Sequence, residues 1–387
     1  AEKTAYGFVM KYFEEKSAKN ALEGKPPIVK RKCEIERIAE GCIDIRRTTG
    51  QHPGGIVVLP IGEEIHSFTP VQHPANDMTT SIVTTHFDYH SIDHNLLKLD
   101  ILGHLDPTMI RMLQDLTGID PLEIPLDSKE VMSLFQNTSA LGIKPEDIGG
   151  TKLGALGIPE FGTDFAMQML MDTKPQYFSD LVRIAGLAHG TDVWLGNAQT
   201  LIKEGKATIS TAICTRDDIM IYLIQKGLDS EESFKIMEMV RKGKVASGKC
   251  KEWPEWKQDM IDHGVPDWYI WSCERIKYMF PKAHAAAYVM MAWRVAYCKV
   301  FYPLAYYTAY FSIRATAFDY EKMAMSPVRL EHYIAEYKAK KAEGTISNTE
   351  EDELGVMRIV QEMHARGYEF TPIDIYKAKA RTFQIID

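Results

Sequence analysis

Residues 95–103 decide the fold of the N-terminal part of the chain, and they read Asn95-Leu96-Leu97-Lys98-Leu99-Asp100-Ile101-Leu102-Gly103. Strand alternation places the apolar side chains of this stretch on one face and Lys98 and Asp100 on the other. A carboxylate near the end of an apolar strand is solvated, paired or bound to a cation. Asp100 is therefore either a partner of Lys98 or of turn amides, or a ligand for Mg²⁺ of the kind that two-metal phosphoryl transfer uses.

A loop rich in glycine and arginine comes earlier in the chain and reads Arg46-Arg47-Thr48-Thr49-Gly50-Gln51-His52-Pro53-Gly54-Gly55. It leads into an apolar run at residues 56–59, which predicts a buried strand. Backbone amides, hydroxyls and two cations together can hold a phosphate. The loop is not a P-loop, because the Gly-Lys-Ser/Thr ending is missing. Its other interpretation is a turn that enters a strand.

Histidines and an aspartate alternate at His86, Asp88 and His90. We expect a strand at residues 86–90, and in a strand these three side chains share one face, as metal ligands do. They could equally bond to one another. The metal-binding interpretation, extended by Asp100, gives a metal-dependent phosphohydrolase as one candidate function.

Helices dominate the rest of the sequence. Asp106 and Pro107 predict a helix start, with the aspartate as N-cap, and Gly118 predicts its end. Further helices are expected from caps at Thr215 and Ser230, and a long one from about residue 283 to 301. The polar stretch 339–352 is expected to be a linker or exposed loop. Strands followed by helices indicate an α+β protein.

Composition sets broad limits on the class of protein. A chain of 387 residues is long enough for two domains, and its hydrophobic content of 45% is that of an ordinary globular protein. None of the six cysteines forms a CxxC pair, so the sequence predicts neither a zinc knuckle nor a redox dithiol. Scattered thiols without a signal peptide suit the cytoplasm. Charged residues in the long helix, such as Arg294 and Lys299, exclude a membrane span. The sequence opens and closes inside expected elements, so both ends are expected to be cuts within a larger protein.

Two basic stretches stand out in a chain whose net charge is −8, and they cover residues 235–251 and 275–299. Cations at a helix C-terminus are favoured by the helix dipole whether or not a ligand binds, which suffices to explain Arg241 and Lys244. Arg216 instead precedes a helix start, where bare amides favour an anion. In residues 280–288 the alanines leave room for a ligand, and His284 and Tyr288 share a face. A tight helix crossing is the other interpretation of that run.

These motifs occur together, and in the same order, in one known family. The shared runs are Arg47 to Gly55, Thr85 to Asp88, Leu97 to His104, His189 to Leu195, Cys214 to Asp218 and Phe280 to Tyr288. Over nearly its whole length the sequence resembles the PolC-type alpha subunits of DNA polymerase III, which are C-family replicative DNA polymerases. Several long motifs in order are far more specific than any one of them.

The resemblance implies a polymerase-beta-like nucleotidyltransferase palm followed by a large, mostly helical fingers domain. We expect the palm to extend to residue 125, the fingers to cover residues 126–345, and residues 346–387 to lead toward a duplex-binding, helix-hairpin-helix region. Asp100 matches the third of three aspartates that hold two Mg²⁺ ions. The other two belong to an Asp-x-Asp motif expected before residue 1. The function implied is template-directed DNA synthesis. The alternative is a binding module for nucleotide, DNA or a nucleotide-mimicking inhibitor that has no activity of its own.

Other site residues follow from the same resemblance. Those implied for the primer terminus are Arg46, Arg47, His52, Gly54 and Gly55. Those implied for the incoming nucleotide are His189, Arg216, Arg241, Lys244, Tyr278, Phe280, Lys282, His284 and Tyr288. The implied partners are primer–template DNA and dNTP, together with a sliding clamp and other replisome subunits that would bind elsewhere on the larger protein.

Overall fold

The chain divides into two compact units, residues 1–103 and residues 104–387. The computed structural model describes residues 4–45, 49–52, 54–88, 91, 94–101 and 103–386. The division falls just after the strand that carries Asp100. It comes earlier in the chain than the boundary expected after residue 125.

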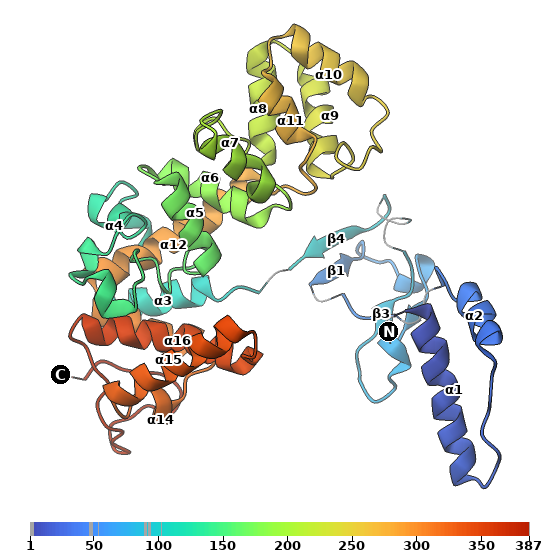
Figure 1. The fold of residues 1–387 in the computed structure, drawn as a ribbon, viewed down its shortest axis with the longest axis horizontal. Coiled ribbons are helices and arrows are strands. Elements are labelled where there is room, and N and C mark those ends of the chain that lie inside the picture. The colour runs from blue at the N-terminus through green and yellow to red at the C-terminus, as the bar shows by residue number, and fades with distance from the viewer. Residues whose placement is uncertain are drawn as a thin grey trace. The chain divides into compact units, whose positions relative to one another are not determined.

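The N-terminal unit contains two helices and two small antiparallel sheets (Figure 1). Its helices and strands are α1 (Ala5–Leu22), α2 (Lys32–Gly41), β1 (Gly55–Val58), β2 (Val71–Gln72), β3 (Thr84–Thr85) and β4 (Leu97–Asp100). Strand β1 pairs with β4, and β2 pairs with β3. The expectation of a strand over residues 86–90 is wrong for its described part, because β3 ends at Thr85 and His86 to Asp88 follow it without strand structure.

The pairing of β1 with β4 aligns Gly55 with Asp100 and Ile56 with Leu99. The amide of Ile101 donates to the carbonyl of Gly54 over 2.6 Å. A Cβ on Gly54 would lie 2.3 Å from the Ile101 carbonyl oxygen, a backbone atom that cannot move aside. Glycine at this position therefore permits the close pairing that places the turn beside Asp100.

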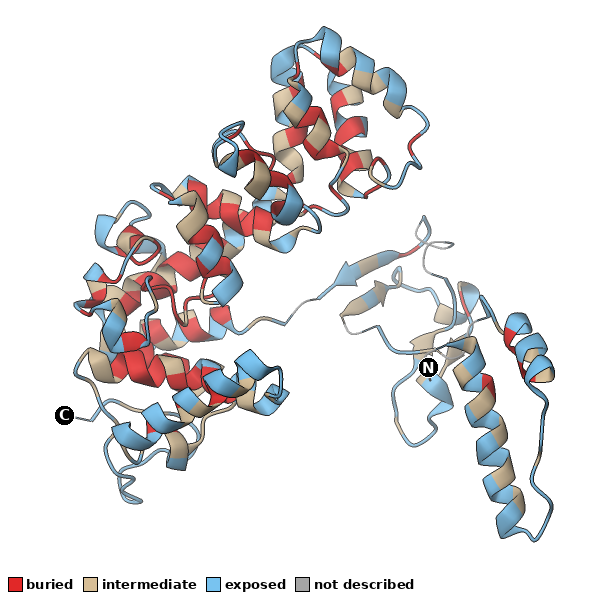
Figure 2. Ribbon diagram, viewed as in Figure 1, coloured by how far each residue is buried: buried red, intermediate tan, exposed pale blue. Residues whose placement is uncertain are grey.

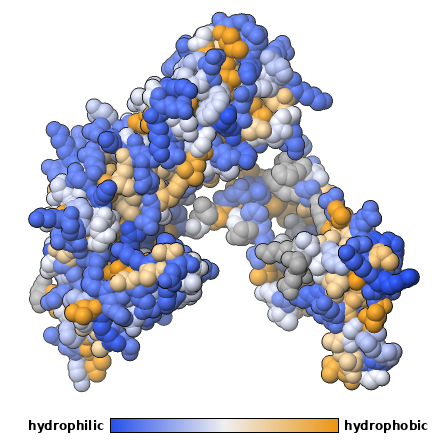
Figure 3. Space-filling model, viewed as in Figure 1, coloured by the Kyte–Doolittle hydropathy of each residue, from blue (hydrophilic) through white to orange (hydrophobic). Residues whose placement is uncertain are grey.

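The N-terminal unit buries few side chains. Its buried cluster consists of Val9, Ile35 and Ala39, which join α1 to α2. The alternation predicted at β4 is present, but its apolar face is exposed, as are Ile56 and Val58 on β1. The burial expected for β1 is therefore wrong, because no described layer packs on that face. Figure 2 shows the scarcity of buried positions in this unit, and Figure 3 shows apolar side chains on its surface.

The C-terminal unit is helical and contains the large core (Figures 1 and 2). Its helices are α3 (Asp106–Thr117), α4 (Lys129–Ser133), α5 (Asp164–Thr173), α6 (Phe178–His189), α7 (Gln199–Lys203), α8 (Arg216–Lys226), α9 (Ser230–Arg241), α10 (Trp253–Asp262), α11 (Asp267–Cys273), α12 (Lys282–Phe301), α13 (Pro303–Ala309), α14 (Tyr320–Met323), α15 (Pro327–Glu343) and α16 (Asn348–Ala365). Helix α12 is the central element, because it packs against α3, α4, α6, α8 and α13.

The C-terminal half of α12 is anchored deep in this core. The indole of Trp293 donates to the carbonyl of Pro125 over 2.8 Å. Lys299 is fully buried, and its ammonium bonds the Glu362 carboxylate and the carbonyls of Gly154 and Leu156. Anchoring one end of α12 fixes the direction of its other end, which leads toward the predicted nucleotide site.

Helix boundaries follow the predicted caps with three corrections. Asp106 is the first helical residue of α3 rather than its N-cap. Asp229, not Ser230, caps α9, because its carboxylate accepts from two amides of the first turn. The loop expected at residues 339–352 is confined to the short connection between α15 and α16, since most of the stretch is helical. Polar residues there cover the exposed faces of helices.

Candidate functional site

An aromatic column runs along the start of α12, and we use that name for Tyr278, Phe280, His284 and Tyr288. Ring centroids of successive members lie 5.3, 5.0 and 4.3 Å apart. His104 continues the series, with its ring 4.8 Å from that of Tyr288. Tyr278 is exposed, and the other members of the column are half-buried. A partly exposed series of rings of this kind can stack against a planar base.

Several distant segments attach to the column through backbone contacts. Thr191 and Tyr278 form an isolated antiparallel bridge. A Cβ on Gly190 would lie 2.9 Å from the carbonyl oxygen of Tyr278, so the backbones meet closely there. The amide of Arg216 donates to the carbonyl of Phe280 over 3.1 Å, and that of Met279 donates to the carbonyl of Arg241 over 3.3 Å. The structure thus assembles residues from three regions of the sequence around one short segment.

Two helix N-termini meet beside the column, those of α8 and α12. The Asp217 carboxylate, in the first turn of α8, accepts from the amide of Lys282 over 2.6 Å. Asp218 accepts from the amides of Cys214 and Thr215. Both aspartates occupy positions where a helix start attracts negative charge. The same field favours a phosphate close by.

The basic side chains predicted to bind the nucleotide differ in whether they already bond a carboxylate. The guanidinium of Arg241 and the ammonium of Lys242 both bond the carboxylate of Glu238. The bond from Arg241 lowers the pKa of Glu238 to about 2, so that this carboxylate is charged at neutral pH. Lys282 lies 3.9 Å from Asp218 and is half-exposed. Within the part of the chain that the structure describes, neither Arg216 nor Lys244 has an acidic partner, which leaves both available to an anion.

His189 stands beside the column at the C-terminal end of α6. Its ring centroid lies 5.5 Å from that of Phe280 and 6.3 Å from that of His284. Its Nε2 bonds the carboxylate of Glu160. This hydrogen bond, opposed by burial and helped by the negative charge, raises the pKa of His189. For Glu160, burial alone would raise the pKa, but the bond and charge of His189 outweigh it and lower that pKa.

A second group of charged or titratable side chains, His104, Asp106 and Arg314, lies close to Glu160. Asp106 is completely buried, and its carboxylate bonds the guanidinium of Arg314. Burial raises the pKa of Asp106, against the attraction of Arg314 and His104. Ligand atoms of His104, Asp106 and Glu160 lie within 4.8 Å of one another, the spacing of a metal site. Asp106 already bonds the guanidinium of Arg314, and Glu160 bonds His189, whose pKa is raised, so the charge balance does not require a metal there.

In the N-terminal unit, Asp100 lies at the exposed end of β4 with its carboxylate 3.2 Å from the ammonium of Lys98. The pairing with Lys98 that the sequence allowed is therefore present. The carboxylate remains 72% exposed, so it can also take a hard cation. Among the described residues, the group of three or more potential metal ligands does not include Asp100.

The turn before β1 is organised by His52. Its Nδ1 accepts from the amides of Gly54 and Gly55, over 3.1 and 2.6 Å. The ring therefore shapes the turn whose second glycine pairs with Asp100. The predicted residues Arg46 and Arg47 lie outside the described residues, so the structure does not test their placement.

The alternative metal site at His86, Asp88 and His90 stays a prediction. His86 and Asp88 do not belong to the ligand group found among the described residues, and His90 lies outside the described part. The backbone amide of His86 donates to the carbonyl of Pro70 over 2.8 Å. All six cysteines are unpaired thiols.

Sequence reasoning missed Glu160, His104 and Asp217 as neighbours of the predicted nucleotide residues. No motif marks Glu160, because its contact with His189 exists only in three dimensions. One local signal does appear in the backbone, since Glu160 has a φ of +68°. Left-handed conformation in a residue other than glycine is a sign of a constrained, often functional, position.

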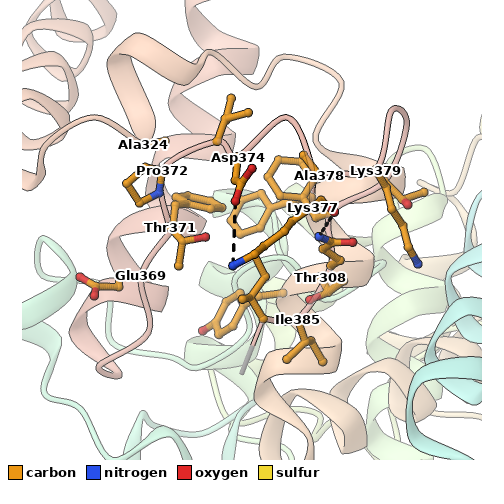
Figure 4. A pocket seen from close by; sticks show the side chains of 18 of the residues that line it. Thr308, Ala324, Glu369, Thr371, Pro372, Asp374, Lys377, Ala378, Lys379 and Ile385 are labelled. Carbon is orange, nitrogen blue, oxygen red and sulfur yellow. Dashed lines mark hydrogen bonds and ion pairs between the residues drawn. The ribbon is translucent and has the colours of Figure 1, made fainter.

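A sizeable cavity lies elsewhere in the C-terminal unit. It has a volume of about 500 Å³ and lies between α13 and the C-terminal segment 368–386 (Figure 4). Aromatic rings, including Phe311, Phe318 and Phe370, form much of its wall. Figure 4 shows the Lys377 ammonium reaching toward the Asp374 carboxylate, 3.9 Å away, across this cavity. None of the predicted site residues lines it.

No described helix, α12 included, combines the length and the apolar character that crossing a membrane requires.

Comparisons with known proteins agree with this layout. The model of the bacterial DNA polymerase III alpha NTPase domain matches residues 3–103, and that of the bacterial DNA polymerase III alpha subunit finger domain matches residues 106–264. Along the sequence, the first match ends at residue 103, where the division between the two structural units also falls. The whole chain is similar to proteins named DNA polymerase III PolC-type, at 52% identity in Caldanaerobacter subterraneus subsp. tengcongensis, 53% in Clostridium perfringens and 54% in Streptococcus suis.

The chain covers 26%, 25% and 26% of those three relatives, about a quarter of each. The two domain models match in the expected order, and the similarity to the relatives extends along the whole chain. Both findings indicate the same family. The chain therefore belongs to the bacterial DNA polymerase III alpha family, and among its members it is similar to the PolC-type proteins.

Proposed function

We propose that this chain is the nucleotide-facing part of a DNA-directed DNA polymerase of the replication machinery. The reaction would be transfer of a nucleotidyl group from a dNTP to a primer 3′-hydroxyl. The observation that carries the proposal is the aromatic column beside two helix N-termini and a set of cations. Such an arrangement suits a ligand with a planar base at one end and phosphates at the other.

Different residues of the C-terminal unit would contact the base and the triphosphate of the nucleotide. Tyr278, Phe280 and Tyr288 would pack near the nascent base pair. Arg216, Lys244 and Lys282 would attract the triphosphate, and Arg241 would join them if its bond to Glu238 opened. Phosphate charge offset in this way stabilises the transition state as well as the bound nucleotide.

The N-terminal unit would contribute part of a polymerase-beta-like nucleotidyltransferase palm. Asp100 would be a ligand for Mg²⁺, which when bound would supply charge stabilisation for nucleotidyl transfer. His52, Gly54 and Gly55 would shape the turn that meets the primer terminus, with Arg46 and Arg47 beside it. The functional limits of palm, fingers and duplex-binding region, at residues 125 and 345, stay predictions.

A second candidate function is a binding module without turnover. It is favoured by one observation, that Asp100 does not join a group of metal ligands among the described residues. In either case the proposed partners are dNTP and primer–template DNA. A sliding clamp and other replisome subunits would bind the larger protein, in the cytoplasm.

Nucleotide binding tests the column. Isothermal titration of the chain with dNTP and Mg²⁺ would be compared with Tyr278→Ala and with the control Tyr376→Ala, an exposed tyrosine outside the column. We expect Tyr278→Ala to weaken binding by about 1–3 kcal/mol, the usual contribution of one base–aromatic contact. The control should bind like the unaltered chain. Equal binding by all three would contradict the proposed site.

Primer extension distinguishes the two candidate functions. The chain would be assayed with Mg²⁺ and dNTPs, alone and with an added segment that carries the Asp-x-Asp motif. Extension that is lost in Asp100→Asn would support the polymerase. It should persist in Asp115→Asn, whose exposed carboxylate pairs with Arg111 in a similar way. Nucleotide binding without extension in both mixtures would favour the binding module.

A further inference from the structure

We propose that Glu160 is a positioning residue for the triphosphate: it holds the His189 ring by Nε2, so that Nδ1 is left to donate a hydrogen bond to a phosphate oxygen. This inference rests on the proposed function, because it assumes that the column binds a nucleotide. It adds to that function a residue that no motif indicates and a chemical role for a histidine beside the rings.

The backbone of Glu160 has a conformation that is unfavourable for a residue with a side chain. Its φ of +68° is left-handed, which costs a residue other than glycine about 1–2 kcal/mol. The segment is fixed on both sides, since Ile158 and Phe161 are buried and the amide of Phe161 donates to the carbonyl of Pro159 over 2.8 Å. Strain that the surroundings maintain directs this carboxylate toward His189.

The bond at Nε2 determines what the other nitrogen can do. Glu160 is an acceptor, so Nε2 must carry a proton. A neutral His189 would then present a lone pair at Nδ1 and repel a phosphate oxygen. A protonated His189 presents an N–H there and attracts one. Nδ1 has no hydrogen-bond partner within the described part of the chain, so it is available to a ligand.

The charges around His189 act on it in opposite directions. Glu160 favours the protonated ring and has a lowered pKa itself, so it stays ionised. The ring centroid of His284, on α12, lies 6.3 Å from that of His189, and His104, before α3, lies close to Glu160. The Asp106 carboxylate behind them is matched by Arg314. Glu160 is thus the carboxylate that bonds His189 directly.

His284 shows the contrast within the same site. Burial, together with the positive charge of His189, lowers the pKa of His284. A neutral imidazole in the column suits stacking on a base, whereas a protonated one beside it suits a phosphate. The Glu160 carboxylate therefore favours the protonated form of His189 for phosphate binding, while His284, whose ring lies 6.3 Å away, is suited to stacking in its neutral form.

The direction of the pH dependence follows. The pKa of His189 is raised in the folded chain, so the donor at Nδ1 is present below that pKa and is lost as pH rises through it. Phosphate affinity should therefore fall as pH rises through the raised pKa of His189. Removing the charge of Glu160 should move this fall to lower pH.

The test uses the whole chain with inorganic tripolyphosphate, a probe that has phosphates but no base. Titration of the His189 ring would be followed by NMR, with His189→Gln to assign its signals. Glu160→Gln keeps a hydrogen-bonding side chain but removes the charge. Glu146→Gln, an exposed glutamate, is the control, and thermal unfolding checks that all variants fold.

We expect the titration midpoint of His189 to fall in Glu160→Gln and not in Glu146→Gln. Near pH 7 the affinity for tripolyphosphate should fall about tenfold in Glu160→Gln, the effect of one charge-assisted hydrogen bond. An unchanged midpoint would overturn the inference. So would a shifted midpoint with unchanged phosphate affinity at every pH. If the unaltered chain binds neither dNTP nor tripolyphosphate, the proposed function fails and the phosphate role with it, whereas the midpoint still reports the pairing.

Discussion

Lys299 shows how far the C-terminal unit depends on individual polar contacts. Its side chain is fully buried, and so is its partner Glu362. Burial lowers the pKa of Lys299, and the attraction of Glu362 opposes that effect. Tyr307 also donates to Glu362, over 2.8 Å. Groups so deep in a core are tolerated because each finds a partner of opposite character.

Removing one member of this pair should be costly. We expect Lys299→Met to lower the free energy of unfolding by about 3–5 kcal/mol, because it leaves the Glu362 charge buried without its partner. The double change Lys299→Met with Glu362→Gln should recover part of the loss. Urea unfolding of the single and double variants measures both effects. A single variant as stable as the unaltered chain would mean that the pair is not buried in solution.

What the sequence could predict about single residues depends on how far apart along the chain the interacting residues lie. The exposure and pairing of Asp100 follow from strand alternation and an adjacent lysine, both local. The roles of Glu160 and Lys299 depend on partners far away in the chain, and no spacing rule encodes them. The resemblance to a family indicated the column residues as a set. The fold gathers them, but their role stays a prediction, and the resemblance gave no reason for Glu160.

At the scale of single elements, helix starts show where local rules hold and where they fail. Thr215 was expected as the cap of α8, and it occupies that position. Its hydroxyl is buried without a hydrogen bond, however, and the carboxylate of Asp218 accepts from the amides of Cys214 and Thr215, which precede the helix. Asp229 took the role expected of Ser230. Both residue types suit an N-cap, so the choice between neighbours depends on how the preceding turn enters the helix.

The cap of α9 can be tested with two adjacent substitutions. Asp229→Ala should lower the free energy of unfolding by about 0.5–2 kcal/mol, because two first-turn amides lose their acceptor. Ser230→Ala is the matched control and should stay closer to the unaltered chain, since its hydroxyl is not the cap. Urea denaturation of both variants makes the comparison. The reverse order of effects would restore Ser230 as the cap.

Elements as a whole were predictable where their signals were strong. The strand before Asp100 and the long helix α12 follow from period and flanking breakers. The strand expected at residues 86–90 failed in its described part, residues 86–88, although the alternation of polar and aromatic residues fits a strand, because strand structure ends at Thr85. The loop expected at 339–352 failed because polarity was taken for irregular structure, although exposed helix faces are equally polar.

At the scale of the whole molecule, the two units differ greatly in how much they bury. Val9, Ile35 and Ala39 make up the buried cluster of the N-terminal unit, whereas most helices of the other unit contribute to one large core. Unequal burial predicts unequal stability, because buried apolar area is the main favourable term in folding. Sequence composition could not show this difference, since both units contain apolar runs of residues.

The difference should appear as two unfolding transitions. All six tryptophans lie between Trp194 and Trp293, so tryptophan fluorescence reports the C-terminal unit, whereas far-ultraviolet circular dichroism also reports α1 and α2. We expect the dichroism signal to begin falling at a lower urea concentration than the fluorescence changes. Coincident curves would mean that the units unfold together and that the N-terminal unit is stabilised by something beyond its own core.

The aromatic column also says something about the order of events during synthesis. Its contacts join Tyr288 to His104, Phe280 to the amide of Arg216, and Tyr278 to Thr191, all far apart along the chain. Closing such long loops is slow, and a growing polypeptide cannot close them before residue 288 has left the ribosome. The N-terminal helices and strands will by then have been exposed to the cell. The nucleotide binding proposed for the column would therefore be a late event, and a chain stalled earlier would lack its stabilising effect.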